Sequence, residues 1–432
     1  MSSSKFPLTP ALPTRIARRV QYAWIVAGLI FMALLVAAGI RSTPGVLIVP
    51  LEEAFGWSRA TVSTAVSINI VLYGLMGPFA AAAMQRFGVR RTLLAALALL
   101  GTACILTTFI SEPWHLMLSW GVLVGLGSGT VALVLAATIV NRWFVERRGL
   151  VMGVLTASTA TGQLVFLPLL ASVVTAYGWQ SVAWVMAAVI VAVIPLVFVF
   201  LPERPRDVGL LPYGAKDASA VPTEAVAGNP VVNALSALSM ASKSRDFWLL
   251  FASFFVCGLS TNGLIGTHLI SACIDNGIPE VQAAGLLAAM GIFDLIGTTA
   301  SGWLSDRYDS RVLLFCYYFF RGLSLLYLPY SEYSFYGLSM FSVFYGLDWI
   351  ATVPPTVRLT TEAFGKQRAP IVFGWIVAGH QLGGGMAASG AGVLRTMFGS
   401  YLEAFLIAGF ACAIAAMMSL MIGRGRARTV AP

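Results

Sequence analysis

The sequence predicts an all-α membrane protein with twelve transmembrane helices in two six-helix halves and with both termini in the cytoplasm. Of its 432 residues, 58% are apolar and only 10% are charged, whereas a soluble domain carries roughly 25% charged residues. Long apolar runs recur along the whole chain, and most Lys and Arg residues lie in alternate loops between them. The composition excludes a soluble enzyme, a nucleic-acid-binding protein and a secreted disulfide scaffold.

Each apolar run is long enough for a membrane-spanning helix, which needs about 20 residues. Lipid offers backbone groups no hydrogen-bond partner, so each span must be helical. The predicted spans of the first half are residues 22–49, 60–84, 92–110, 115–140, 149–175 and 180–201. Those of the second half are residues 247–273, 281–304, 312–329, 333–353, 369–394 and 401–422. Pro354-Pro355 is expected to end or kink the tenth span.

These spans divide the chain into five segments. They are a cytoplasmic N-terminal tail (1–21), an N-terminal half (22–202), a cytoplasmic linker (203–245), a C-terminal half (246–422) and a cytoplasmic tail (423–432). The linker is rich in Pro, Gly, Ala, Ser and Asp, a composition typical of loops. Its last part, residues 234–245, is either a short amphipathic helix on the membrane surface or a solvated loop.

The positive residues behind the net charge of +9 are unevenly distributed between the two sides of the predicted membrane. Of the 27 Lys and Arg residues, all but Arg41, Arg59, Arg321 and Arg395 lie in the tails, the linker and every second loop. Loops rich in Lys and Arg stay in the cytoplasm, so both termini are predicted to be cytoplasmic. The expected location is the cell inner membrane, as a multi-pass protein. Arg59 and Arg395 fall in outside segments, and Arg41 and Arg321 fall within spans.

Two loops at equivalent places in the halves share a charged pattern. Gly302-Trp-Leu-Ser-Asp306-Arg307 continues to Arg311, and Arg86-Phe-Gly88-Val-Arg90-Arg91 occupies the matching loop. Both resemble the G-x-x-x-D-R-x-G-x-R-R loop of the major facilitator superfamily, although the first copy has Gln85 in place of the Asp. The resemblance implies the major facilitator fold and a cytoplasmic gate that latches the halves together. The predicted gate residues are Asp306, Arg307, Arg311, Arg86 and Arg90; the alternative is ordinary positive charge of inside loops.

A longer stretch from Trp143 to Gly153 enters the fifth span. It resembles the same region of monocarboxylate transporters and of their bacterial relatives, which include the oxalate/formate antiporter group. Residues 201–214 and 345–356 look like that bacterial group as well. The resemblance implies a secondary transporter that moves a small organic anion, a monocarboxylate or related carboxylate, by alternating access with proton symport.

Ionisable side chains within the membrane are costly and usually face a cavity or a partner. Arg41 in the first span can hold a carboxylate through two hydrogen bonds. His380 in the eleventh span can also bind a carboxylate, and it falls where the oxalate/formate antiporter has a substrate-binding lysine. The alternatives are an Arg41 that reaches the outer interface and a His380 that is satisfied by a neighbouring helix. Further candidates for substrate binding, each of which could instead join helices, are Asn69, Tyr73, Gln163 and Asn262.

Asp294 in the eighth span resembles the aspartate that takes part in proton coupling in the monocarboxylate family. That family has an arginine four residues later, where this chain has Thr298. Burial raises the pKa of a carboxyl group, so that such a group can accept a proton. The alternative is that Asp294 neutralises Arg321; a structural pair between Arg321 and either Asp348 or Asp294 is the favoured interpretation of that arginine.

The chain has no nucleotide-binding loop, metal-ligand cluster or catalytic nucleophile pattern, so the sequence predicts no enzyme, metal or cofactor. The five cysteines stand singly in apolar stretches and are expected to be buried. The predicted partners are a small organic anion, protons and the lipid bilayer, without nucleic acid, for a protein that acts as a monomer. Two alternatives stay open. One is an exchanger or efflux carrier for a neutral or aromatic compound, which would explain Thr298; the other is a transport-fold sensor that signals to a partner.

Overall fold

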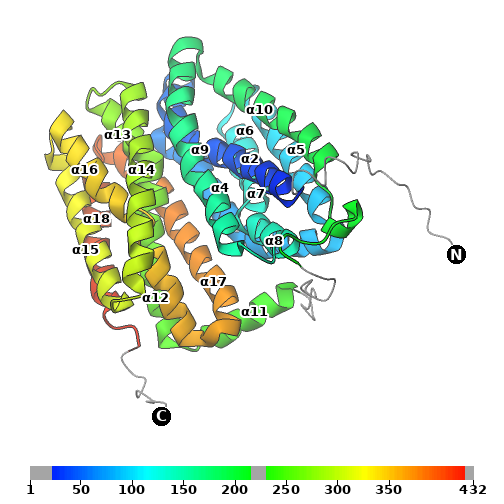
Figure 1. Ribbon diagram of the computed structural model, residues 1–432. Helices are drawn as coiled ribbons and strands as arrows, with labels where there is room; N and C mark the ends of the chain where they lie inside the picture. Colours follow the sequence, from blue (N-terminus) through cyan, green and yellow to red (C-terminus); the bar gives the residue numbers. More distant parts are fainter. Residues whose placement is uncertain (1–21, 216–229, 424–432) are drawn as a thin grey trace.

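The computed structural model describes residues 22–215 and 230–423, and the chain is helical through nearly all of both ranges (Figure 1). Within these ranges the one contact of β type is an isolated bridge between Phe144 and Tyr213. The described part of the protein is therefore all-α, as the apolar runs predict.

Helix boundaries in the first part of the chain follow local signals. Ser58 caps α4 by accepting a hydrogen bond from the Thr61 amide, and Gly88 separates α4 from α5 with a φ of 91° that suits glycine. The helices are α2 (Tyr22–Ser42), α3 (Pro44–Phe55), α4 (Arg59–Phe87), α5 (Val89–Thr107), α6 (Pro113–Leu116), η1 (Met117–Val124), α7 (Gly125–Thr130), α8 (Leu133–Trp143), α9 (Arg148–Tyr177), α10 (Trp179–Phe200) and η2 (Pro205–Val208).

The second part of the chain begins with a helix in the predicted linker, Pro230–Ala241, which overlaps the segment 234–245 but begins and ends earlier. A position of this helix on the membrane surface stays a prediction. The helices are α11 (Pro230–Ala241), α12 (Arg245–Gly258), η4 (Leu259–Ile265), α13 (Gly266–Asp275), α14 (Glu280–Ser305), α15 (Ser310–Tyr327), η5 (Leu328–Tyr330), α16 (Phe335–Asp348), α17 (Val353–Phe398) and α18 (Leu402–Ser419). Two segments, η1 and η4, are π-helical, and the sequence patterns did not predict them.

Among the described residues, ten helices or runs of helices are long and apolar enough to cross a membrane. The predicted span 149–175 lies in α9, which has 30 residues, and the predicted span 333–353 falls on α16 and the turn after it. These helices support a multi-pass membrane protein. The count of twelve spans, the cytoplasmic termini and the borders of the two halves stay predictions.

Two boundaries differ from the expected ones. The first span continues past residue 49 to Phe55, because α3 follows α2 after a break at Thr43. The tenth span is interrupted before Pro354-Pro355: α16 ends at Asp348, and the prolines lie in the first turn of α17. A proline is tolerated there because the first amides of a helix have no partner within it. These prolines therefore begin a helix and do not end one.

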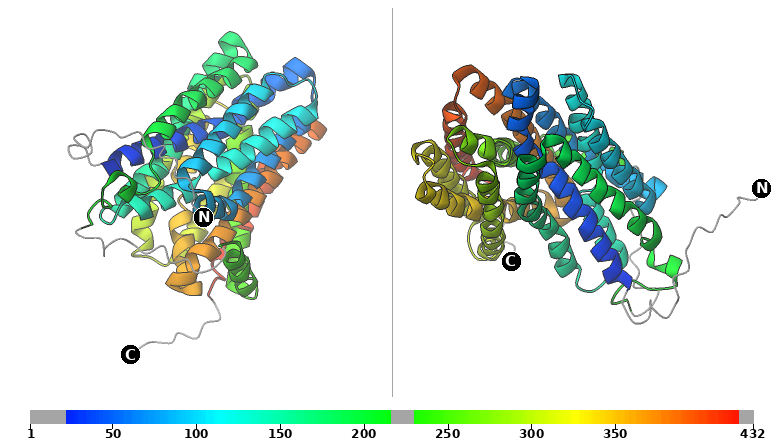
Figure 2. Two further views of the ribbon diagram at one scale, coloured as in Figure 1. Left: turned by 90° about the vertical axis from the view of Figure 1, so that its right-hand side faces the viewer. Right: turned by 90° about the horizontal axis from the view of Figure 1, so that it is seen from above.

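Helices from residues 22–200 gather on one side of the molecule and those from residues 245–419 on the other (Figures 1 and 2). The two groups meet where α4 packs along α17, α9 along α14 and α3 against α13. Small residues permit the close approach: the Ser67 hydroxyl donates to the Gly385 carbonyl at 2.6 Å. A Cβ atom at Gly385 would lie only 2.5 Å from the Val71 side chain.

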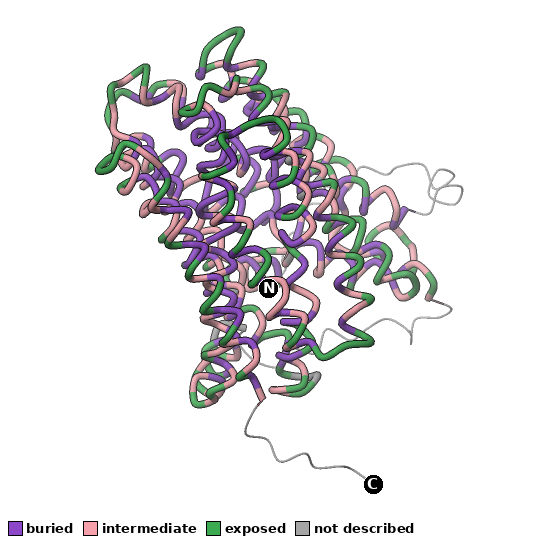
Figure 3. Tube along the Cα trace, turned by 90° about the vertical axis from the view of Figure 1, so that its left-hand side faces the viewer, coloured by how far each residue is buried: buried purple, intermediate pink, exposed green. Residues whose placement is uncertain are grey.

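Burial follows the same arrangement. Buried residues fill the inside of both helix groups, and exposed residues follow their outer faces (Figure 3). Many of these exposed side chains are large and apolar, among them Phe79, Phe109, Trp184, Phe320 and Phe410. Soluble proteins rarely expose so much apolar surface, whereas the hydrocarbon of a bilayer accommodates it.

Candidate functional site

A small cavity of about 50 Å³ lies where the two helix groups meet, and we call it the central cavity. It has room for a few water molecules. Four of the residues predicted to bind substrate line it: Arg41, Asn69, Tyr73 and Asn262. The other lining residues are Ser42, Pro44, Val66, Ile70, Leu167, Gly266, Thr267, Leu287 and Gln381.

Arg41 is the only charged residue that lines the central cavity. It lies in the last turn of α2, and its guanidinium carbon lies 4.2 Å from the centre of the Tyr73 ring. A cation above an aromatic face is attracted to the ring. Within the described residues this half-buried guanidinium has neither an ion-pair nor a hydrogen-bond partner, so its N–H groups remain available to an anion.

Carboxamide groups add hydrogen-bonding capacity to the cavity. The Asn69 amide donates to the Trp120 carbonyl at 2.8 Å, which fixes its orientation. The Asn262 amide lies 3.4 Å from the Gln381 side-chain oxygen, a long hydrogen bond between the π-helical segment η4 and α17. Gln381 was not among the predicted substrate-binding residues.

Two predicted substrate-binding residues are not among the cavity-lining ones. The side chain of Gln163, in α9, lies outside the described residues. His380 packs beside Phe254, with ring centres 4.9 Å apart, and its Nε2 lies 3.5 Å from the Thr261 hydroxyl. Its Nδ1 is buried without a partner among the described residues. His380 thus contacts the η4 region, and the next residue, Gln381, lines the central cavity.

Asp294 is hydrogen-bonded to the turn that interrupts the tenth predicted span. Its carboxylate oxygen Oδ1 accepts hydrogen bonds from the Thr298 hydroxyl and from the Ile350 amide, both at 2.9 Å. Ile350 lies in the turn between α16 and α17. The close fit of α14 to this region is seen at Gly297, where a Cβ atom would collide with the Leu347 carbonyl oxygen. Asp294 therefore links α14 to the interruption and does not line the central cavity.

Arg321 pairs with Asp348, which is one of the two structural pairs that the sequence favours for this arginine. The Arg321 Nε donates to Asp348 at 2.7 Å, and both side chains are buried. The same guanidinium donates to the backbone carbonyls of Asp348 and Trp349 and to the Cys257 sulfur. It thereby donates hydrogen bonds to backbone carbonyl groups that have no partner within the helix where α16 ends.

An ion network crosses between the helix groups at the end of the molecule where α4 begins, and we call it the Arg59 network. The Arg59 side chain, only 6% exposed, binds Glu52 from its own helix group. It also donates across the interface to Asp275 at 3.0 Å and to the Tyr401 hydroxyl at 3.2 Å. Arg395 donates to the same Asp275 at 2.7 Å. The sequence placed Arg59 and Arg395 in outside segments but gave them no role.

Tyr401 extends the Arg59 network to His268. Its hydroxyl lies 2.9 Å from His268 Nδ1, and His268 Nε2 lies 2.8 Å from the Ala388 carbonyl. A phenol keeps its proton at neutral pH. It can therefore accept from Arg59 and donate to His268 Nδ1, which leaves Nε2 to donate to Ala388.

The residues of the predicted cytoplasmic gate make local contacts here. Arg307 lies over the Trp303 ring, and Arg86 lies over the Phe87 ring. Arg90 lies over the Phe198 ring. Arg311 pairs with Asp309, and this hydrogen bond lowers the pKa of the Asp309 carboxyl group. Among the described residues no ion pair joins this gate set across the two helix groups, so the latch stays a prediction for another conformation.

Within residues 22–215 and 230–423, no group of three His, Cys, Asp or Glu side chains is arranged to hold a metal ion. All five cysteines are free thiols, and only Cys316 is not buried.

Comparison with known proteins bears on the family and the fold. A family model described as Major Facilitator Superfamily matches residues 29–388. The chain is 27% identical to an uncharacterized MFS-type transporter, YcxA, of Bacillus subtilis, over 88% of this chain and 90% of that protein. It is also 27% identical to monocarboxylate transporter 13 of Bos taurus, over 90% of this chain and 86% of that protein.

Solved structures show the same fold. A crystal structure of a bacterial homolog of the human lysosomal transporter Spinster, in an inward-facing and occupied conformation, matches with a TM-score of 0.73 and 15% identity. The match covers 94% of this chain and 98% of that one.

Proposed function

Because the chain belongs to the Major Facilitator Superfamily and is related to monocarboxylate transporters, we propose that it carries a small organic anion of the monocarboxylate type by alternating access with proton symport. We place it in the cell inner membrane as a monomer with both termini in the cytoplasm. The moving parts are the predicted halves, residues 22–202 and 246–422. We expect a carrier that needs no cofactor and performs no catalysis.

One observation carries the choice of an anion. The central cavity contains a guanidinium without an anionic partner among the described residues, and none of its lining residues is acidic. An Arg side chain presents paired N–H groups that fit a carboxylate. A carboxylate substrate would supply the missing negative charge. The side-chain amides of Asn262 and Gln381 would form hydrogen bonds with other polar atoms of the substrate.

Thr298 favours a second candidate, the exchange or efflux of a neutral or aromatic compound. Its hydroxyl donates to Asp294, where the related carriers have an arginine, so this part of α14 provides no second cation. The Tyr73 ring in the cavity could also stack on an aromatic substrate. The two candidates differ in whether a carboxylate is accumulated.

The test is uptake of labelled carboxylates into proteoliposomes, with and without an inward proton gradient. We expect at least one small carboxylate to accumulate above its equilibrium level only when the gradient is present. If no carboxylate accumulates under any gradient, symport of an organic anion is wrong. A panel of neutral and aromatic compounds then tests the second candidate, and binding of a partner protein without any flux would favour a sensor.

Asp294 is the residue we propose to carry the proton. Asp294→Asn keeps an oxygen for the Ile350 amide but removes the titratable carboxyl group. We expect gradient-driven accumulation to be lost, whereas exchange of substrate across the membrane without a gradient continues. The measurement compares uptake under a proton gradient with counterflow. The exposed carboxylate Glu53 offers a control: Glu53→Gln should keep both activities, and accumulation that persists in Asp294→Asn would remove Asp294 from the coupling role.

The Arg59 network supports a state that is closed at one end. With the proposed topology this is the outer end, because α4 begins outside and α17 ends there. Within the Arg59 network, Arg59 supplies the bonds that cross between the helix groups, whereas Arg395 and Asp275 both belong to the second group. Opening this end would have to break the bonds from Arg59 to Asp275 and Tyr401.

We therefore expect Arg59→Ala to open the outer end more often. A cysteine at the cavity position Ser42 would report this through its rate of labelling by a membrane-impermeant maleimide added outside. A hydrogen bond to a charged group contributes roughly 1.5–3 kcal/mol, so labelling should become about tenfold faster or more. Arg395→Ala is the matched control, since it removes a cation from the network but no cross-group bond. Equal labelling rates in Arg59→Ala and the parent would show that the Arg59 network does not hold the outer end closed.

A further inference from the structure

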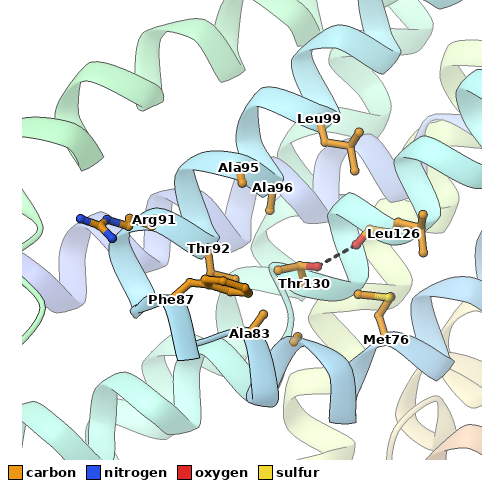
Figure 4. Close-up of a pocket in the computed structure, with 11 residues that line it drawn as sticks. Met76, Ala83, Phe87, Arg91, Thr92, Ala95, Ala96, Leu99, Leu126 and Thr130 are labelled. Carbon is orange, nitrogen blue, oxygen red and sulfur yellow. Dashed lines mark hydrogen bonds between the residues drawn. The ribbon is translucent and has the colours of Figure 1, made fainter. Parts of the chain in front are cut away.

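A second cleft, larger than the central cavity, lies between α4, α5 and α7 (Figure 4). Its volume is about 530 Å³. The walls are mostly alanine and larger apolar side chains, including Ala83, Phe87, Ala95 and Leu99. We call it the α4–α5 cleft.

The α4–α5 cleft offers almost nothing to a polar ligand. Its two hydroxyl groups are already engaged, since Thr92 donates to the Gly88 carbonyl at 2.7 Å and Thr130 donates to the Leu126 carbonyl at 2.9 Å. Arg91 is the only charged residue among those that line it. A hydrocarbon chain is therefore the kind of occupant that the walls fit.

The cleft borders the outer face of the protein. Arg91 and Ala95 are exposed, and Phe87 is 57% exposed. They lie on α5, or just before it on α4, and α5 packs against α10, η1, α4 and α7, all from its own helix group. The exposed face of a spanning helix at the outside of the bundle meets lipid.

Positive charge collects at one end of this cleft. Arg86, Arg90 and Arg91 surround the turn between α4 and α5, and Figure 4 shows Arg91 at the end of the cleft. The carboxylate close to them is Glu203, which accepts hydrogen bonds from the amides of Val89 and Arg90 and lies 4.0 Å from Arg142. The turn thus has an excess of positive charge where the spans meet the membrane surface.

We propose that the α4–α5 cleft binds an anionic phospholipid from the bilayer. One acyl chain fills the cleft, and the phosphate pairs with Arg91 within the field of Arg86 and Arg90. Basic groups beside a groove between transmembrane helices are suited to anionic headgroups. This site is separate from the central cavity, so it does not depend on the substrate that is carried.

The test counts lipids bound to the purified full-length protein in detergent by native mass spectrometry. Phosphatidylglycerol and phosphatidylcholine with the same acyl chains are compared, and glycerol phosphate serves as the headgroup alone. We expect one saturable phosphatidylglycerol site, weaker binding of phosphatidylcholine and no measurable binding of glycerol phosphate. Equal binding of the two lipids would overturn the proposal, and retention of glycerol phosphate alone would show an anion site without a role for the cleft.

Variants locate the site. Ala95→Trp fills the cleft from its exposed wall and should abolish the saturable binding, whereas Ala98→Trp, exposed on the same helix but outside the lining, should not. Arg91→Ala should weaken phosphatidylglycerol binding about fivefold, the effect of one cation near the surface. Arg358→Ala, which removes an exposed charge from another helix, is its control. Unchanged binding in Ala95→Trp and Arg91→Ala would reject this site.

Discussion

Replacing Arg41 by alanine is expected to reduce carboxylate uptake into proteoliposomes about 30-fold or more. Arg41 is the one charged residue that lines the central cavity, so a bound carboxylate would lose the cation that compensates it. Truncating one partner of a buried, hydrogen-bonded charge pair costs roughly 2–5 kcal/mol, and about 1.4 kcal/mol corresponds to a tenfold change. The loss should appear in kcat/KM for uptake.

Two further variants make this result specific. Arg41→Lys keeps the charge but loses the paired N–H groups, so we expect it to retain part of the activity. Arg358→Ala removes an exposed arginine that pairs with Glu362 and should transport like the parent. Folding should survive in Arg41→Ala, because the contact of the half-buried Arg41 with the Tyr73 ring contributes only about 0.5–2 kcal/mol. Full carboxylate uptake by Arg41→Ala would remove it from the site and favour a neutral substrate.

Much of the central cavity could be predicted because membrane helices restrict where polar residues are stable. Arg41, Asn69, Tyr73 and Asn262 stood out as polar groups within apolar spans, and the structure brings them to one cavity. The cost of a polar group in hydrocarbon is a local property. It can therefore be recognised in the sequence without knowledge of the packing.

The direction in which a side chain points was harder to predict. The sequence selected His380, yet the neighbouring Gln381 reaches the cavity. Adjacent residues on a helix point about 100° apart, so the rotation of α17 about its own axis decides which of the two faces the cavity, and the sequence does not determine that rotation. The π-helical segment η4 also changes the turn of the chain around Asn262, and no local signal for it was recognised.

The Arg59 network depends on contacts between distant parts of the chain. Asp275 and Tyr401 lie 216 and 342 positions from Arg59 along the sequence. Only the packing of the two helix groups decides which charges meet. The position of Arg59 and Arg395 in outside segments, where the chain has few cations, is a signal that could have indicated a role for them. Both arginines pair with the same carboxylate, Asp275.

The largest effect on stability is expected from Arg321. Its side chain is completely buried and provides the one hydrogen bond to the Asp348 carboxylate among the described residues, because the other oxygen of Asp348 is buried without a partner. Arg321→Met would leave that carboxylate unpaired and would also free the carbonyls of Asp348 and Trp349. Breaking a buried pair on one side costs roughly 3–5 kcal/mol.

Equilibrium unfolding in mixed detergent micelles would measure this loss in the free energy of unfolding. The double variant Arg321→Met with Asp348→Leu removes both charges, so it should recover more than half of the loss, since apolar replacement of a whole buried pair is often nearly neutral. It should not recover all of it, because the two carbonyls at the end of α16 still lack their donor.

Arg358→Met, at an exposed pair, should change stability by no more than about 1 kcal/mol. If Arg321→Met is no less stable than Arg358→Met, the pair does not hold the α16–α17 break together. If the single and double variants lose the same amount, the contacts to the carbonyls and to Cys257 matter more than the charge of Asp348.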